Sequence, residues 1–322
     1  MKTTIPDELK AAVPKTQWGR ILTATPVVMT IVATMLAGLA SSEMTRAQYD
    51  RSLAAQQQSK AGDQWSYFQA KRLRGGIQRS TLDILQSTAP VRPLNSKQFR
   101  QSATDLSVPA DRPEAAKAKT ELLSLLDSSP GQQTLKVLES GELPAAPARD
   151  ATDNQVEAAL NAIETTQPEP DVAALVAPIK VATVNEDLRT AVARAQAFDK
   201  LLAPLNRTIE QIENLLLRAG AAPDRDFTGA RLRYAGSRYD AESRLNQSVA
   251  NLYELQVRQS NMSAERHHRR SQRFFFGMLA AQAAVIIATF SIAAQKRSLL
   301  WSLAAVAGLA AIGFAIYVYF FI

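Results

Sequence analysis

The only two histidines of the chain, His267 and His268, are the first candidates for metal or acid–base chemistry. Neighbouring side chains on a helix point about 100° apart, so this pair cannot hold one metal ion from one face. The chain has no cysteine, which excludes thiolate nucleophiles, cysteine metal ligands and disulfides. We therefore expect no metal site here, and a cationic segment whose charge is mildly sensitive to pH.

A second group of chemically capable side chains lies in the run DQWSYFQAK, residues 63–71. On a helix, Trp65 and Phe68 share one face of this run. Asp63, Tyr67 and Lys71 share another. Such faces line ligand pockets in some proteins, but we favour a packing contact with a second helix or a second chain. The sequence contains no Ser/His/Asp set, phosphate-binding loop or zinc-protease motif, so we expect no enzyme, no catalytic residue and no cofactor.

These groups lie between three long apolar runs, at 21–40, 274–294 and 299–322. Each run has about 20 residues without a charge, enough to cross roughly 30 Å of hydrocarbon as a helix. The first run has the small residues and basic flank of a signal peptide, but it exceeds the usual core of about 7–15 residues, so we interpret it as an anchor. The sequence predicts a three-pass membrane protein with the lipid bilayer as a partner and residues 1–20 as an N-terminal tail.

Lysine and arginine near the ends of the apolar runs predict the orientation. Lys10, Lys15 and Arg20 precede the first run, and Lys296 and Arg297 lie between the last two. Because such residues remain in the cytoplasm, we expect the long insert between the first and second runs to face the other side, in a periplasm.

The net charge of +7 is unevenly distributed along the insert. Residues 105–171 hold 13 acidic and 5 basic residues, and the basic excess gathers in ERHHRRSQR, residues 265–273, directly before the second run. A basic cluster can bind nucleic acid, but its position next to a span favours lipid phosphates, and we expect no nucleic acid partner. The predicted headgroup collar consists of Arg266, Arg269, Arg270 and Arg273. In the orientation above, these arginines face outward, against the positive-inside rule.

The insert is patterned as helices. Between 41 and 88 only three glycines weaken a helix, so the first span is expected to continue as a stalk helix. Along it, apolar and small residues recur at helical spacing: Ile77, Thr81, Ile84 and Leu85. Prolines punctuate residues 89–180. Short helices fit between these prolines, at Glu114 to Leu126, Gln132 to Leu138 and Asn154 to Thr165. Helices of this length are not stable alone, so we expect a small helical cap or a mobile loop.

The clearest periodicity lies in a middle helix expected over 181–219. Its apolar residues step by 4, 3, 4, 3 and 4, as in the a/d seam of a coiled coil. This set, which we call the α-helical seam, is Phe198, Leu202, Leu205, Ile209, Ile212 and Leu216. Pro204 should kink or restart the helix. A return helix over 225–273 then leads into the second span. We predict an all-α fold: three transmembrane helices, a long antiparallel coiled-coil-like stalk and a small cap.

One polar side chain, Gln282, stands out in the last two runs. Because no Asp, Glu, Lys or Arg accompanies it there, we expect it to form a hydrogen bond between helices and not to take part in transport.

Three segments resemble a bacterial membrane family described as domain of unknown function 4337: KAGDQWSYFQAKRLR at 60–74, ERHHRRSQRFFFGMLAAQAAVIIATFSI at 265–292, and the basic turn before Trp301. The resemblance implies a first span that leads into a helix, a basic collar and a two-span hairpin, in a bacterial inner membrane. The stretch from about Ala89 to Lys180 looks longer than the insert usual in that family. The resemblance implies no reaction, cofactor or catalytic residue.

Two functions from different classes fit these features. The first is a membrane-anchored helical scaffold or accessory subunit that forms a homo-oligomer or holds a larger complex together. The alternative is a component of a transport or energy-coupling assembly, since one span, a large insert and a hairpin resemble proton-driven motor subunits in outline. An ionisable residue within the spans would favour the alternative, and the three runs contain none.

Overall fold

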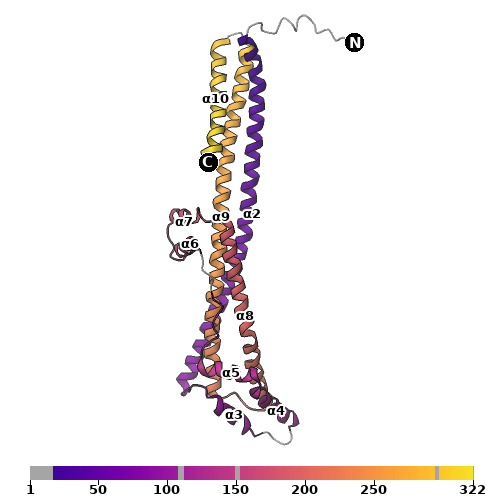
Figure 1. The fold of residues 1–322 in the computed structure, drawn as a ribbon, viewed down its shortest axis with the longest axis vertical. Helices are drawn as coiled ribbons and strands as arrows, with labels where there is room; N and C mark the ends of the chain where they lie inside the picture. Colours follow the sequence, from indigo (N-terminus) through magenta and orange to yellow (C-terminus); the bar gives the residue numbers. More distant parts are fainter. Residues whose placement is uncertain (1–16, 108–111, 149–152, 294–296, 322) are drawn as a thin grey trace, which may run out of the picture. The chain divides into compact units, whose positions relative to one another are not determined.

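The computed structural model describes residues 17–107, 112–148, 153–293 and 297–321, and within them every regular element is an α-helix. This confirms the all-α class. The helices in chain order are α2 (Gln17–Thr88), α3 (Ser96–Thr104), α4 (Pro113–Asp127), α5 (Ser129–Ser140), α6 (Asn154–Glu164), α7 (Glu169–Val176), α8 (Val181–Arg218), α9 (Arg225–Ala293) and α10 (Arg297–Phe321) (Figure 1). Lys10, Lys15 and Lys296, on which the predicted orientation depends, lie outside the described residues.

Two helices are long and apolar enough to cross a membrane. They are the described parts of α2, Thr23–Thr88, and of α9, Arg225–Ser291. Helix α10 is also apolar, and the stretch of it that could be tested for a span is Ser302–Val318. Length and composition thus show two membrane-length helices, and the third span stays a prediction.

The chain divides into two compact units. Unit 1 comprises residues 1–55 and 258–322, and unit 2 comprises 56–257. Because α2 ends at Thr88 and α9 begins at Arg225, each of these helices contributes residues to both units. The units are described separately below.

Unit 1 is built from small and apolar side chains of α2, α9 and α10. Its buried cluster is Ala33, Leu36, Ala40, Phe274, Ala281, Ala311 and Val318. Glycines mark the closest approaches: a Cβ on Gly277 would lie 3.3 Å from Leu36 Cδ1, and one on Gly308 would lie 2.7 Å from Met29 Sδ. Small residues at helix contacts allow this close packing, which is typical of helices in membranes.

Unit 2 has its core around the α-helical seam on α8. All six residues of the seam are buried, and they pack on α3, α4, α5 and the beginning of α9. The aromatic centre of this core is Phe227 of α9, whose ring stacks on Phe99 of α3 with centroids 4.9 Å apart. The coiled-coil pairing expected between two stalk helices is therefore only part of the contact, because the short helices cover much of the seam. Helices α3, α4 and α5 thus pack on the seam.

Helix α8 runs through Pro204 without interruption. The expectation that this proline restarts the helix is therefore wrong. Proline removes one backbone donor, but the surrounding apolar contacts of Leu202 and Leu205 hold the chain in helical conformation on both sides of it. The Thr208 hydroxyl donates to the Pro204 carbonyl at 3.0 Å.

Helices α4 and α5 join at a single residue, Ser128, which ends α4 and caps α5. Its Oγ donates to the Leu125 carbonyl at 2.5 Å and accepts from the Gly131 N–H at 3.2 Å. A Cβ on Gly131 would lie 2.0 Å from the Leu125 carbonyl oxygen, so only glycine fits at this corner.

Two short helices, α3 and α7, were not expected from the sequence. Asn95 caps α3, its Oδ1 accepting from the Gln98 N–H at 3.0 Å. An Asn followed three residues later by Gln is a capping signal that could have revealed α3. Helix α7 follows Pro168 and packs on α6, burying Val172 and Val176.

Candidate functional site: two sets of polar contacts between α2 and α9

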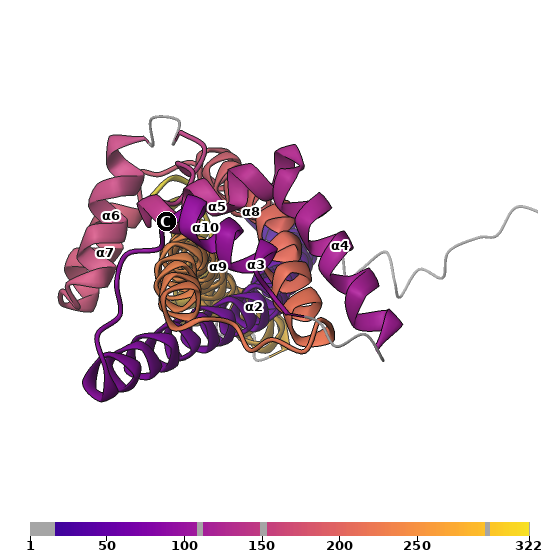
Figure 2. The same ribbon diagram turned by 90° about the horizontal axis from the view of Figure 1, so that it is seen from below.

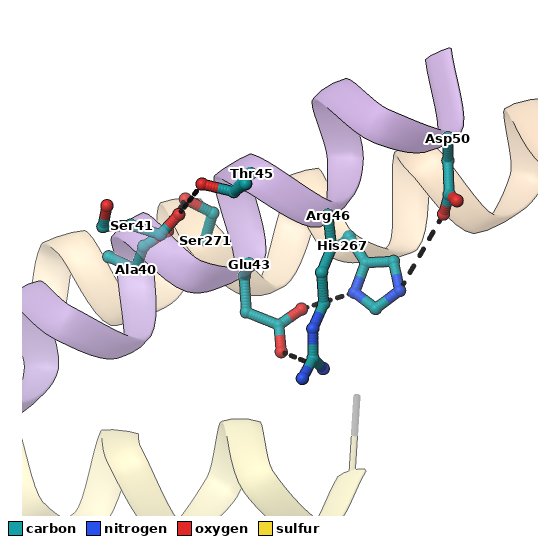
Figure 3. A network of polar contacts seen from close by, with 8 residues as sticks. All are labelled: Ala40, Ser41, Glu43, Thr45, Arg46, Asp50, His267 and Ser271. Carbon is teal, nitrogen blue, oxygen red and sulfur yellow. Dashed lines mark hydrogen bonds and ion pairs between the residues drawn. The ribbon is translucent and has the colours of Figure 1, made fainter. Parts of the chain in front are cut away.

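The first set lies in unit 1, where His267 of α9 lies between two carboxylates of α2 (Figure 3). Nδ1 of His267 is 2.5 Å from Oε2 of Glu43, and Nε2 is 4.0 Å from Oδ2 of Asp50. Arg46 Nη1 lies 3.6 Å from the other oxygen of Glu43. Glu43 and Asp50 are two helical turns apart on one face of α2, so a single ring from α9 reaches both.

One turn further along α9, the Ser271 hydroxyl donates to the Ala40 carbonyl at 2.7 Å (Figure 3). Ser271 is buried, and Ala40 belongs to the apolar cluster of unit 1. Since this hydroxyl is committed to a backbone carbonyl, it is not activated by a base, and the group lacks the nucleophile–base pair of a hydrolase. These contacts join α9 to α2 at the boundary between the apolar and the polar residues of the two helices.

The two nitrogens of His267 face different carboxylates, and no set of three or more potential ligands occurs among the described residues. His268 points elsewhere, with Nε2 at 3.0 Å from the Gln272 amide nitrogen. It lines an open groove of about 610 Å³ with Ala37, Met44 and Phe275.

The four arginines of the predicted collar have different surroundings. Arg269 donates from Nε to Glu265 at 2.9 Å, and this hydrogen bond lowers the pKa of the Glu265 carboxyl. The Arg273 guanidinium lies 5.7 Å from the centre of the Tyr317 ring. Arg266 is exposed and Arg270 is half-buried. Three of them, Arg266, Arg270 and Arg273, fall on one side of α9 by helical spacing.

The second set lies in unit 2 and involves the predicted run at 63–71. Trp65 Nε1 donates to Oε1 of Glu254 in α9 at 2.6 Å. The ring of Phe68 packs edge-on against Trp65, with centroids 5.3 Å apart, and the Arg72 guanidinium lies 5.9 Å from the centre of the Phe68 ring. Trp65 thus combines an apolar contact with a polar bond, as half-buried tryptophans commonly do.

The centre of this second set is the buried carboxylate of Glu242 in α9. It pairs with Lys71 of α2 and lies 3.5 Å from Nε of Arg238, one turn earlier on α9. Asp240 pairs with Arg79 of α2. The two helices approach closely here, because a Cβ on Gly75 would lie 3.1 Å from Oδ1 of Asp240.

The order of these partners shows that α2 and α9 are antiparallel. In unit 1, Leu36 lies near Gly277 and Glu43 near His267. In unit 2, Trp65 binds Glu254, and Arg225 at the start of α9 donates to Leu85 near the end of α2. In both units the residue number on α9 falls as the number on α2 rises.

The helical faces predicted from the sequence differ from the contacts observed in the second set. Trp65 and Lys71, expected on different faces, both contact α9, whereas Tyr67 is exposed. The acidic partners in both sets were missed. Nothing local marks Glu43, Glu242 or Glu254 as a partner of the other long helix, because each lies more than 150 residues from the side chain that it binds.

Gln282 also departs from expectation. Its side chain is exposed, and no hydrogen bond joins it to another helix in the described part of the chain. The reason is its position on α9: the neighbouring alanines, Ala281 and Ala284, occupy the buried face. A bond between helices through Gln282 would need a second chain.

These features define an all-α protein in which two helices of membrane length carry a helical insert. Residues 21–124 match the model of the family described as domain of unknown function (DUF4337). The chain therefore contains a DUF4337 segment, which confirms the resemblance inferred from the run at 60–74. The match also covers α3 and most of α4, so the beginning of the proline-rich stretch belongs to it, whereas the resembling residues 265–292 lie outside it. No curated protein and no solved structure matches the chain.

Proposed function

We propose that this protein is a non-enzymatic, membrane-anchored helical scaffold or accessory subunit. One observation carries the proposal: α2 and α9 each combine an apolar window of membrane length with a polar segment that is joined to the other helix by buried polar contacts. A helix that is apolar at one end and fastened by salt bridges at the other is suited to hold a folded insert at a membrane surface.

The use of the buried polar groups supports a structural role. Glu43, Glu242 and Ser271 are all buried, and each binds a residue of the other long helix. Catalytic side chains commonly face a cavity with their reactive atoms free to meet a substrate. The carboxylates of Glu43 and Glu242 face the neighbouring helix, and the Ser271 hydroxyl, although it borders the groove beside His268, is bound to the Ala40 carbonyl.

The finer topology is part of the proposal. We infer three spans, with α10 as the third, in a bacterial inner membrane, and the insert in the periplasm. The basic residues before α2 and in the turn before α10 support this orientation. Arg266 and Arg269, both exposed, then lie at the level of the lipid phosphates as part of the arginine collar.

Fractionation tests the membrane anchor. The full-length protein should remain in the membrane pellet after a high-salt and alkaline wash and should dissolve only in detergent. Recovery in the soluble fraction after the wash would overturn the proposal. Orientation is read separately: a cysteine at exposed Ser140 should react with a membrane-impermeant maleimide in spheroplasts, whereas one at Ser298 should not. The opposite pattern would place the insert in the cytoplasm.

One observation supports the alternative, a component of an energy-coupling assembly. The titratable pair Glu43 and His267 lies directly beside the apolar cluster of unit 1. A coupling role requires that this pair exchange protons. Glu43→Gln should then abolish the proton-coupled activity of the assembly while the protein still assembles. If the protein is a scaffold, Glu43→Gln should reduce its function only in proportion to the stability that the fold loses.

A further inference from the structure

A row of exposed apolar side chains follows the far part of α2. Leu73, Ile77 and Ile84 are 67%, 52% and 65% exposed. Together with Ala70 and Ser80, which are also exposed, they step along the chain by 3, 4, 3 and 4 residues. We call these five residues the α2 stripe. Single exposed apolar residues are common, but three large aliphatic side chains in a row on one helical face indicate an interaction surface.

Other described parts of unit 2 occupy a different side of α2. Lys71, Gly75 and Arg79 contact α9, and by helical spacing they lie about 180° around the helix from the α2 stripe. A shallow hollow beside Leu73, Ile77 and Ile84 is lined by α2 residues alone. Figure 2 shows this end of α2 at the outer edge of the neighbouring helices. The α2 stripe is therefore open to a partner.

The residue types at each position indicate which partner fits. In heptad terms, Ala70, Ile77 and Ile84 occupy a positions, and Leu73 and Ser80 occupy d positions. Among parallel coiled coils, isoleucine at a, as at positions 77 and 84, with leucine at d, as at position 73, favours two strands over three or four. In that arrangement each side chain of the α2 stripe packs beside the same residue of the other copy.

The flanking charges are compatible with self-pairing. Across a parallel pair, g positions face e positions of the next heptad, so Gln69 faces Arg74, and Asp83 faces Thr88. The first pair matches an amide oxygen to a guanidinium, and neither pair opposes like charges. The nearby cations are engaged within their own chain: Arg79 pairs with Asp240, and Arg72 lies over Phe68.

We propose that the α2 stripe is the dimerisation surface of this protein and that its occupant is the α2 stripe of a second copy, in parallel. The proposal rests on the membrane anchoring inferred above. Since α2 is one helix from its apolar window to the α2 stripe, two copies anchored in the same orientation present their stripes in the same direction. The interface is only about two heptads long, less than a soluble coiled coil needs. Confinement in one membrane raises the effective concentration and compensates for this.

Single-cysteine crosslinking tests the proposal directly, because the chain has no cysteine of its own. Ile77→Cys and Leu73→Cys should each form a disulfide-linked dimer on mild oxidation of native membranes. Arg72→Cys is the matched control: it is exposed on the same helix but lies outside the a and d positions. We expect at least ten times more dimer from Ile77→Cys than from Arg72→Cys.

Three results would overturn the proposal. Equal crosslinking at positions 72, 73 and 77 would mean random collision. Crosslinking only in a mixture of Leu73→Cys with Ile84→Cys chains would mean an antiparallel pair, and a crosslink from position 77 to a different protein would identify another partner. As a second measurement, Ile77→Asp should reduce dimer formation by Leu73→Cys at least tenfold. The protein must stay in the membrane pellet throughout. Loss from the pellet would instead contradict the anchoring on which the proposal depends.

Discussion

The α-helical seam on α8 and the α2 stripe have the same spacing of apolar residues but opposite surroundings. Every residue of the seam is buried, the most exposed being Leu205 at 8%, whereas the large residues of the α2 stripe are more than half exposed. The seam lies beside α3, α4, α5 and the beginning of α9, and the α2 stripe has no such cover in the described part of unit 2. The comparison shows that spacing determines which face of a helix is apolar, while only the rest of the fold determines whether that face is covered.

A substitution should therefore have opposite consequences in the two places. In the seam it should lower the stability of the single chain. In the α2 stripe it should leave the chain folded and change only its association with a second copy.

The largest effect is expected for Ile209→Asp in the seam. The change places a carboxylate among Leu126, Leu205 and Phe227 without a cation, so it should destabilise unit 2 by more than about 4 kcal/mol. We expect the insert to become sensitive to protease while the protein stays in the membrane pellet. The control is Ile77→Asp, which adds the same charge to an exposed position and should leave protease resistance as it was. Equal resistance in both variants would mean that the seam is open to solvent.

The matched truncations Leu202→Ala and Leu73→Ala should show the same contrast without adding a charge. Leu202 is fully buried, so its truncation should cost about 2–5 kcal/mol. Leu73→Ala should change the stability of the chain by less than about 0.5 kcal/mol, because the side chain is already exposed. Thermal unfolding in detergent, at a protein concentration where dimers dissociate, measures both. A similar loss for the two variants would mean that part of the chain covers Leu73.

Substitution of the buried Glu242 tests the contact between α9 and the side of α2 that lies away from the α2 stripe. Glu242→Gln removes the charge that faces Lys71 and Arg238, and we expect a loss of about 2 kcal/mol, below the range for a fully buried pair because Lys71 is partly exposed. Asp240→Asn is the control. Its pair with Arg79 is more exposed and should contribute less than about 1 kcal/mol. Hydrogen exchange in residues 65–88 should rise for the first variant and not for the second.

The smallest effect concerns pH. Tyr234 packs against the seam and donates to Oδ1 of Asn206 at 2.9 Å, and burial raises the pKa of its hydroxyl to about 12. The unfolded chain ionises this group near pH 10, so the stability that its neutral form contributes is complete below pH 10 and is lost as the pH rises to 12. The unfolding temperature of Tyr234→Phe should therefore fall less steeply over this interval than that of the parent chain. Parallel curves would indicate that Tyr234 is hydrated.

Much of the fold follows from residues that interrupt helices. Helix α2 ends at Thr88, two residues before Pro90, and α8 ends before Gly220, which adopts a positive φ of 82°. The short helices α4, α5 and α6 begin and end close to the prolines and capping residues that predict them. Helices α3 and α7 were missed because each offers only two buried residues, too few to establish a period.

The candidate site was far less predictable. The period-seven pattern identified the seam residues, but not the helices that cover them. The pairs that join α2 to α9 depend on the register of two antiparallel helices. Moving α9 by one turn would give Glu43 and Lys71 different partners without any change in local sequence. The sequence likewise placed Trp65 on a helical face but did not identify Glu254 as its partner.

The cap imposes an order on synthesis. The corner at Ser128 brings α4 and α5 together within a few residues of chain, so this pair can form as soon as it leaves the ribosome. Its apolar face, including Leu122, Leu126 and Leu138, then has no cover until residues 198–227 have been translated. At about 5–20 residues per second, that interval lasts several seconds. The apolar face of the newly made cap therefore stays uncovered until α8 and the start of α9 have been synthesised.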